Sequence, residues 1–133
     1  MTLTAIRSAF LDFIADPFLV SEQDSVRYLE DGLLVLEDGK IKDFGPYSEL
    51  SAQYTNLPTI TYPDKLILPG FIDTHIHFPQ VEILASYGEQ LLEWLTTYTF
   101  PAERKFHNQD YAQKVAAFFL DELLRNGTTT ALV

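Results

Sequence analysis

The segment at residues 66–80 constrains the fold of this chain more than any other: it is apolar, a Pro-Gly pair interrupts it, and it carries two histidines one residue apart. Proline cannot donate a hydrogen bond to a sheet ladder, and glycine permits unusual backbone angles. We therefore expect a domain boundary at Pro69-Gly70 and a new strand over residues 71–77. The polar residues at the end of that strand are the first candidates for a functional site.

Side-chain alternation along the expected strand places His75 and His77 on one face, together with Phe71 and Asp73. Two residues of strand rise separate the histidine Cα atoms by roughly 6.5 Å, so both imidazoles can reach one metal ion through bonds of about 2.0–2.1 Å. Two ligands do not complete a metal site, however, and solvent or backbone partners also explain polar residues at a strand end. Asp73 lies deeper, where a structural role is favoured over the orientation of a ligand.

The residues around this pair resemble a known family. Pro-Gly-Phe-Ile-Asp-Thr-His-Ile-His at residues 69–77 is similar to the first-strand signature of the metal-dependent amidohydrolase superfamily. Leu-Leu-Glu-Trp-Leu at residues 91–95 and Phe-Pro-Ala-Glu at residues 100–103 resemble the guanine deaminases within it, as does Asn-Gly-Thr-Thr-Thr-Ala at residues 126–131. The whole superfamily shares the short His-x-His motif, whereas the longer run is much more specific.

This resemblance implies a hydrolase that uses one divalent metal, zinc in the first place and iron as the alternative. His75 and His77 are then metal ligands at the mouth of a (β/α)₈ barrel. Gln80, whose amide has both donor and acceptor groups, is expected to contact the substrate guanine, and His77 is expected to contact it as well. The other metal ligands and the acid/base residues are expected downstream, so no catalytic residue is assigned here. His107, in a polar loop, is expected to be an ordinary surface residue.

The chain is too short to contain the whole barrel that this resemblance implies. A (β/α)₈ barrel needs about 250 residues and no fewer than about 200, and the chain has 133. We therefore expect an α/β fold that is the N-terminal portion of a guanine deaminase. Residues 1–68 would form a small, β-sandwich-like β-sheet subdomain that is part of a composite domain, and residues 69–133 the first β/α units of an incomplete barrel. The isolated chain is expected to be inactive, and the full-length enzyme to be a homodimer, as family members often are.

Composition excludes several other classes. Nineteen acidic against nine basic residues give a net charge of −10, so we expect no nucleic-acid partner. The absence of cysteine excludes disulfides and the His/Cys/Cys zinc site of cytidine-type deaminases, and it suits a cytoplasmic protein. No apolar run approaches the ~20 residues that span a bilayer, and no signal peptide is evident, so no membrane partner is expected.

Turn signals and apolar patterns predict the elements of the first half. A short helix is expected over residues 47–54, and residues 26–29 fit either a short strand or an irregular connection. An Asp-Gly turn at residues 38–39 predicts a hairpin. Strands are expected at residues 5–13, 33–36, 41–44, 59–62 and 65–68.

The second half is predicted to be helical and then to return to a strand. One helix is expected over residues 90–98, ended by Pro101. A longer helix over residues 109–125 is expected to begin at an Asn108 cap and to end at Gly127, before a strand over residues 128–133. Its predicted apolar stripe is Val115, Phe118, Phe119 and Leu123.

Two alternatives to a guanine deaminase stay open. The first is another aminohydrolase of nitrogen heterocycles in the same superfamily. The second is a non-catalytic binding or interaction module, because a fold by itself argues no site.

Overall fold

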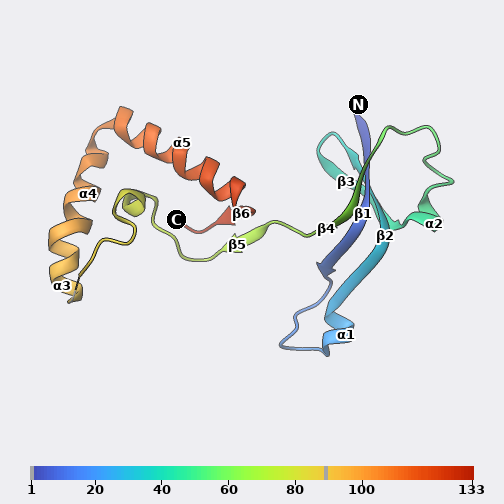
Figure 1. Cartoon of the computed structure of the whole chain (residues 1–133), viewed down its shortest axis with the longest axis horizontal. Coiled ribbons are helices and arrows are strands. Elements are labelled where there is room, and N and C mark those ends of the chain that lie inside the picture. The colour runs from blue at the N-terminus through green and yellow to red at the C-terminus, as the bar shows by residue number, and fades with distance from the viewer. Residues whose placement is uncertain (1, 89) are drawn as a thin grey trace. The chain divides into compact units, whose positions relative to one another are not determined.

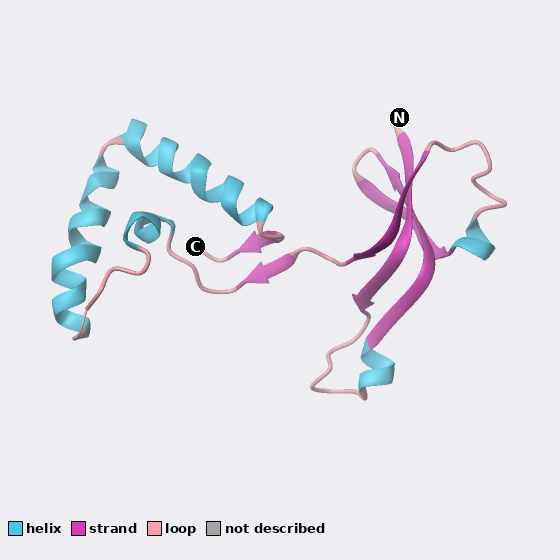
Figure 2. Ribbon diagram, viewed as in Figure 1, coloured by secondary structure: helices cyan, strands magenta, loops and turns pink. Residues whose placement is uncertain are grey.

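The computed structural model describes residues 2–88 and 90–133. The chain divides into two compact units, Met1–Pro69 and Gly70–Val133, so the division falls within the Pro-Gly pair. The first unit is mostly strand and the second mostly helix (Figures 1 and 2).

The first unit is built on one four-stranded mixed sheet in the order β3-β2-β1-β4. β1 pairs antiparallel with β2, β2 pairs antiparallel with β3, and β4 runs parallel to β1. The strands are β1 (Leu3–Phe13), β2 (Val26–Glu37), β3 (Lys40–Pro46) and β4 (Thr59–Ile67), and single-turn helices α1 (Glu22–Ser25) and α2 (Tyr47–Leu50) lie in the connections. Within residues 2–69 all of the strands join this one sheet, so a sandwich-like subdomain would take its second layer from other residues, as the expected composite domain implies.

The hairpin between β2 and β3 is confirmed, with Asp38 and Gly39 both at positive φ (49° and 79°). β2 is longer than predicted: residues 26–37 form one strand of 12 residues instead of two short segments. β2 continues through Gly32. The ring of Phe10 covers this position, and a Cβ there would lie 2.6 Å from Phe10 Cδ2. The glycine therefore serves close packing within the sheet.

β4 is likewise one strand where two were predicted. Asp64, at φ 56°, lies inside β4, and the pairing with β1 shifts register between Arg7 and Ala9. The buried Ser8 Oγ lies 3.1 Å from the carbonyl oxygen of Tyr62 and 2.8 Å from that of Lys65. The Ser8 hydroxyl is a hydrogen-bond donor for carbonyl groups at the point where the register shift interrupts the β1–β4 ladder. The Pro63-Asp64 pair therefore makes β4 irregular without ending it.

The core of the first unit lies on one face of the sheet. Ala5, Leu33 and Val35 are fully or almost fully buried there. The chain from α2 to β4 covers them with the partly buried side chains of Tyr47, Leu50, Tyr54 and Leu57. The predicted helix over residues 47–54 is shorter than expected, since α2 ends at Leu50 and turns replace the rest.

The second unit begins and ends with a strand. β5 (Phe71–Asp73) and β6 (Thr128–Ala131) form a parallel two-stranded sheet, and the predicted order of strand, helices and strand is confirmed. The intervening elements are a 3₁₀ helix η1 (Phe78–Ile83), α3 (Leu91–Trp94), a π-helical turn η2 (Leu95–Thr99), α4 (Phe100–Arg104), a 3₁₀ turn η3 (Lys105–His107) and α5 (Gln109–Arg125).

The helical run from α3 to α4 continues where the sequence predicts an end. Pro101 stands in the first turn of α4, directly after the π-helical turn, and Thr99 and Phe100 both keep right-handed helical angles. Within a helical run a proline removes one backbone hydrogen bond, and here it follows a π-helical turn, where the regular i→i−4 ladder is already interrupted. The prediction that Pro101 ends the helix is therefore wrong.

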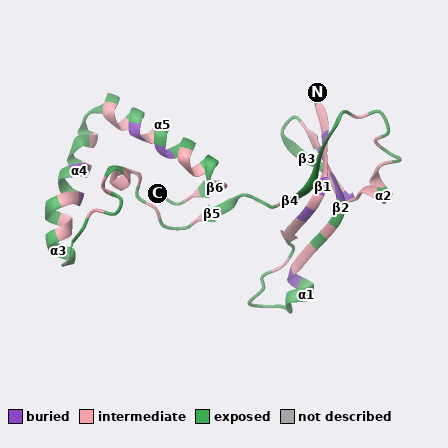
Figure 3. Ribbon diagram, viewed as in Figure 1, coloured by how far each residue is buried: buried purple, intermediate pink, exposed green. Residues whose placement is uncertain are grey.

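α5 matches its prediction at both ends. Asn108 Oδ1 accepts a hydrogen bond from the Tyr111 backbone N–H (3.1 Å), and Gly127, at φ 86°, leads out to β6. Of the predicted apolar stripe, Val115 and Phe119 are buried, but Phe118 is 54% exposed (Figure 3 shows the alternation along α5). Among the described residues, no helix has both the length and the apolar character needed to cross a membrane.

Candidate functional site

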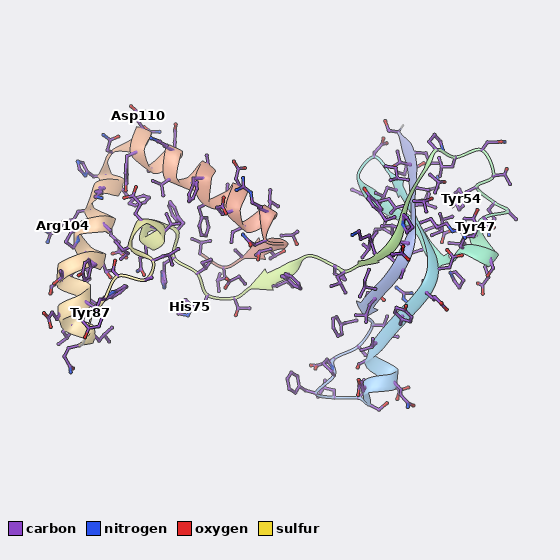
Figure 4. The ribbon with its side chains drawn as sticks, in the orientation of Figure 1. Tyr47, Tyr54, His75, Tyr87, Arg104 and Asp110 are labelled. Carbon is purple, nitrogen blue, oxygen red and sulfur yellow. The ribbon has the colours of Figure 1, made fainter. Side chains whose placement is uncertain are left out.

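The two candidate histidines lie on the connection between β5 and η1 (Figure 4 labels His75). The predicted strand over residues 71–77 is wrong in its length, because β5 ends at Asp73. Asp73 Oδ1 accepts a hydrogen bond from the His75 backbone N–H (3.0 Å), and such a turn takes that N–H away from the ladder. The chain nevertheless stays beside β6, because Leu132 donates to the Asp73 carbonyl (2.9 Å) and accepts from the Ile76 N–H (3.2 Å).

The imidazoles of His75 and His77 converge. Their Nε2 atoms lie 2.9 Å apart, and their rings meet at an interplanar angle of 73°. Two metal–nitrogen bonds of about 2.0–2.1 Å together exceed that separation, so one ion can reach both nitrogens. The donor set therefore fits one metal ion. It is incomplete, because no group of three or more potential metal ligands occurs within residues 2–88 and 90–133.

Gln80 lies one turn beyond the histidines, in η1. Its backbone N–H donates to the His77 carbonyl (3.1 Å), which ties η1 to the second histidine. Its side-chain Nε2 donates to Glu103 Oε1 on α4 (3.0 Å), and both of these side chains are half-buried. The structure thus brings Gln80 to a carboxylate 23 positions further along the chain.

Aromatic rings anchor η1 to the helices that follow. The ring of Phe78, the first residue of η1, meets the Phe106 ring edge to face at 5.2 Å and lies 6.0 Å from the ring of the buried Phe119. Phe106 in turn contacts Tyr111 at 5.1 Å. These contacts join η1, η3 and α5 in one apolar cluster.

A polar cluster holds the far end of η1. Glu82 Oε2 accepts a hydrogen bond from the Tyr111 hydroxyl (2.6 Å) and pairs with Lys105 Nζ (3.1 Å). The Tyr111 hydrogen bond, and then the one from Lys105, lower the pKa of Glu82. The Glu82 carboxylate correspondingly raises the pKa of Tyr111 and of Lys105. η1 is thus held to the following helices at both of its ends.

Sequence reasoning located the histidines but not the contacts around them. His107 is exposed on η3 and its Nδ1 bonds to the Arg104 carbonyl, so the prediction of a surface residue is confirmed. Asp73 bonds to the backbone of His75, a contact that leaves both of its predicted roles open. The contact of Glu103 with Gln80 was missed, because no spacing rule relates a loop glutamine to a helix glutamate far along the chain.

These observations define an α/β chain in which a short strand leads to two convergent imidazoles and a helical connection returns to a parallel strand. The profile of the Amidohydrolase family matches residues 66–133. The chain belongs to the amidohydrolase family.

Individual relatives are similar over nearly the whole chain. Guanine deaminase of Escherichia coli (strain K12) is 47% identical over 136 residues, which cover 99% of this chain and 30% of that protein. The crystal structure of guanine deaminase from Bradyrhizobium japonicum superimposes with a TM-score of 0.91 at 43% identity, over 98% of this chain and 29% of that one. Guanine deaminase from C. acetobutylicum, solved with guanine in its active site, gives 0.79 at 32% identity, again over 98% and 29%. The chain therefore spans less than a third of the length of these relatives.

Proposed function

We propose that this chain is the N-terminal portion of a guanine deaminase, an enzyme that adds water to guanine and releases xanthine and ammonia. Residues 1–68 would be its small β-sheet subdomain, and residues 69–133 would begin a (β/α)₈ barrel with β5 and β6 as its first two strands. The similarity to guanine deaminases along nearly the whole chain supports this assignment. The parallel pairing of β5 and β6 also suits neighbouring strands of such a barrel.

The convergence of His75 and His77 is the single observation that carries the proposal. These two side chains would hold one divalent metal ion, zinc in the first place and iron as the alternative. A metal at this place would supply Lewis-acid activation of water for hydrolysis at neutral pH. The remaining ligands and the acid/base residues would come from outside this chain.

The residues of this chain would otherwise bind and orient the substrate. Gln80 would hydrogen-bond the purine edge, and His77, tied to Gln80 through its carbonyl, would lie between the metal and the base. Because η1 is held at both ends, Gln80 would keep its place relative to the histidines when substrate arrives.

The test is the activity and substrate profile of the full-length protein. We expect release of xanthine and ammonia from guanine, with no comparable turnover of cytosine or of amino-triazines. His75→Ala and His77→Ala should abolish the reaction, while His107→Ala should leave it intact. Preference for another heterocycle would favour the second candidate, another aminohydrolase. Absence of any deamination by a folded, metal-loaded protein would favour a binding module.

Three further properties belong to the same proposal. The isolated 133-residue chain would be inactive, since it has two metal ligands and no assigned acid/base residue. The full-length enzyme would be a homodimer, which light scattering after size-exclusion chromatography measures directly. It would work in the cytoplasm, to which the cysteine-free composition is suited.

A further inference from the structure

The contact between Gln80 and Glu103 determines which way the Gln80 amide points. A carboxylate can only accept hydrogen bonds, whereas an amide has a donor end and an acceptor end. The Gln80 atom that lies 3.0 Å from Glu103 Oε1 must therefore be the amide nitrogen, Nε2. A flipped amide would place two acceptor oxygens against each other.

This orientation leaves the carbonyl oxygen of Gln80 available. Among residues 2–88 and 90–133, the bond to Glu103 is the one hydrogen bond of the Gln80 side chain, and no group donates to its Oε1. The side chain is only half-buried, so this oxygen can still meet a ligand. Gln80 therefore offers a hydrogen-bond acceptor whose direction is set by another residue.

Glu103 is well placed to impose that direction. It stands on α4 directly after Ala102, which is buried, so its backbone is anchored in the second unit. Gln80 stands on η1, whose two ends are held by the Phe78 and Glu82 contacts. The backbone of both residues is thus held by other contacts. The hydrogen bond between them therefore sets the orientation of the Gln80 side chain and is not needed to hold η1 in place.

We propose that Glu103 is a positioning residue that fixes the Gln80 amide with its carbonyl oxygen toward the ligand, so that the site selects a base edge carrying N–H donors. This inference rests on the proposed function. Guanine carries such donors at N1 and at its 2-amino group, and a base edge that carries only acceptors would face the Gln80 oxygen unfavourably.

A swap of the two side chains tests the orientation in the full-length protein. Glu103→Leu removes the acceptor and should raise the KM for guanine about tenfold, the effect of one hydrogen bond, with kcat and metal content little changed. Gln80→Glu sets two carboxylates against each other and should be at least as damaging. The double variant Gln80→Glu with Glu103→Gln restores the bond in reverse and again offers an acceptor, so its KM should return to within a few-fold of wild type.

Glu93→Leu is the matched control, because Glu93 is an exposed glutamate in the same helical run whose side chain forms no hydrogen bond or ion pair with the residues that the structure describes. It should leave the KM unchanged. A Glu103→Leu variant with wild-type KM, or a double variant no better than Gln80→Glu alone, would overturn the proposal.

A second readout does not depend on activity. With ¹⁵N-glutamine labelling, the Gln80 side-chain NH₂ signal, identified by its loss in Gln80→Leu, should exchange slowly with water in wild type and faster in Glu103→Leu. An unchanged signal would refute the positioning role alone. A wild-type protein that does not deaminate guanine would refute the proposed function and the ligand-facing role, whatever the state of this amide.

Discussion

The Nε2 atoms of His75 and His77 lie 2.9 Å apart, and both residues come after the end of strand β5. Alternation along a strand predicts that the two side chains share a face, but the structure reaches this result differently. β5 ends at Asp73, whose side chain accepts a hydrogen bond from the His75 N–H. Leu132 then forms two backbone hydrogen bonds, one with Asp73 and one with Ile76. The convergence therefore depends on a turn and on the end of β6.

The first prediction concerns metal binding by this pair. In the full-length protein, His75→Ala or His77→Ala should lower metal affinity by more than about 100-fold, because even the loss of an outer partner of a ligand costs 10–100-fold. Elemental analysis after dialysis measures the metal that each variant retains. His107→Ala should retain the wild-type content, since His107 bonds to a backbone carbonyl. Full retention by His75→Ala would show that the pair does not bind the metal.

The second prediction concerns the pH dependence of stability around Glu82. Folding lowers the pKa of Glu82, so its contribution is present above the pKa of the unfolded state, about 4.3, and is lost as pH falls through the lower folded value. Folding raises the pKa of Tyr111, so that contribution is present below about pH 10 and is lost as pH rises through the folded value. Tyr111→Phe removes the hydrogen bond and keeps the ring. The gap in urea midpoint between wild type and this variant should be widest between about pH 6 and 9.

Tyr28→Phe provides the comparison for this measurement, because Tyr28 is an exposed residue of β2 with no described hydroxyl partner. Its urea midpoint should follow that of wild type across the same pH range. A Tyr111→Phe gap that stays constant from pH 3 to pH 11 would contradict the coupling of Glu82 and Tyr111.

Elements with strong local signals could be predicted from the sequence. α5 has a side-chain cap at Asn108 and a left-handed exit at Gly127, and both signals act within one turn of the helix. The turn at residues 38–39 is equally local. The middle of β2, residues 30–32, was not predicted to be strand, because its polar residues suggest a loop. There the strand pairs with β1 on both sides, and Asp31 also forms a two-point ion pair with Arg7 on β1, with both bonds at 2.7 Å.

The difference between local and long-range signals also explains which contacts of the site could be predicted. His75 and His77 are neighbours in sequence, so spacing suffices to pair them. Gln80 and Glu103 are joined only because η1 folds back onto α4, and that depends on the packing of Phe78 against Phe106 and Phe119. Contacts between elements that are distant in sequence have no periodic pattern from which they could be predicted.

The third prediction concerns the cap of α5. Asn108→Ala removes the acceptor for the Tyr111 N–H and should destabilise the protein by about 1 kcal/mol. Asn108→Ser keeps a capping oxygen and should restore most of that loss. Urea unfolding measures both changes, and hydrogen exchange at the Tyr111 amide should accelerate in the alanine variant only. Equal stability of all three proteins would mean that the cap contributes nothing to α5.

The fourth prediction concerns the close approach of Gly70 to β6. A Cβ at Gly70 would lie 2.0 Å from Thr129 Oγ1 and 2.6 Å from Thr129 Cβ, so the start of β5 or Thr129 would have to move. Gly70→Ala should therefore cost about 1–3 kcal/mol of stability. Gly39→Ala is the control, since its added Cβ meets open space and its cost comes only from a φ of +79°.

Combining each glycine variant with Thr129→Gly separates the two causes. Thr129→Gly removes the obstructing side chain, so the double variant with Gly70→Ala should lose at least about 1 kcal/mol less than the sum of the single changes. With Gly39→Ala the effects should add, because that position has no neighbour for its Cβ to strike. Urea midpoints of the five variants and wild type measure both couplings. Additive behaviour at Gly70 would show that β5 moves away from β6 to accept a side chain, and that their close approach is not what requires a glycine there.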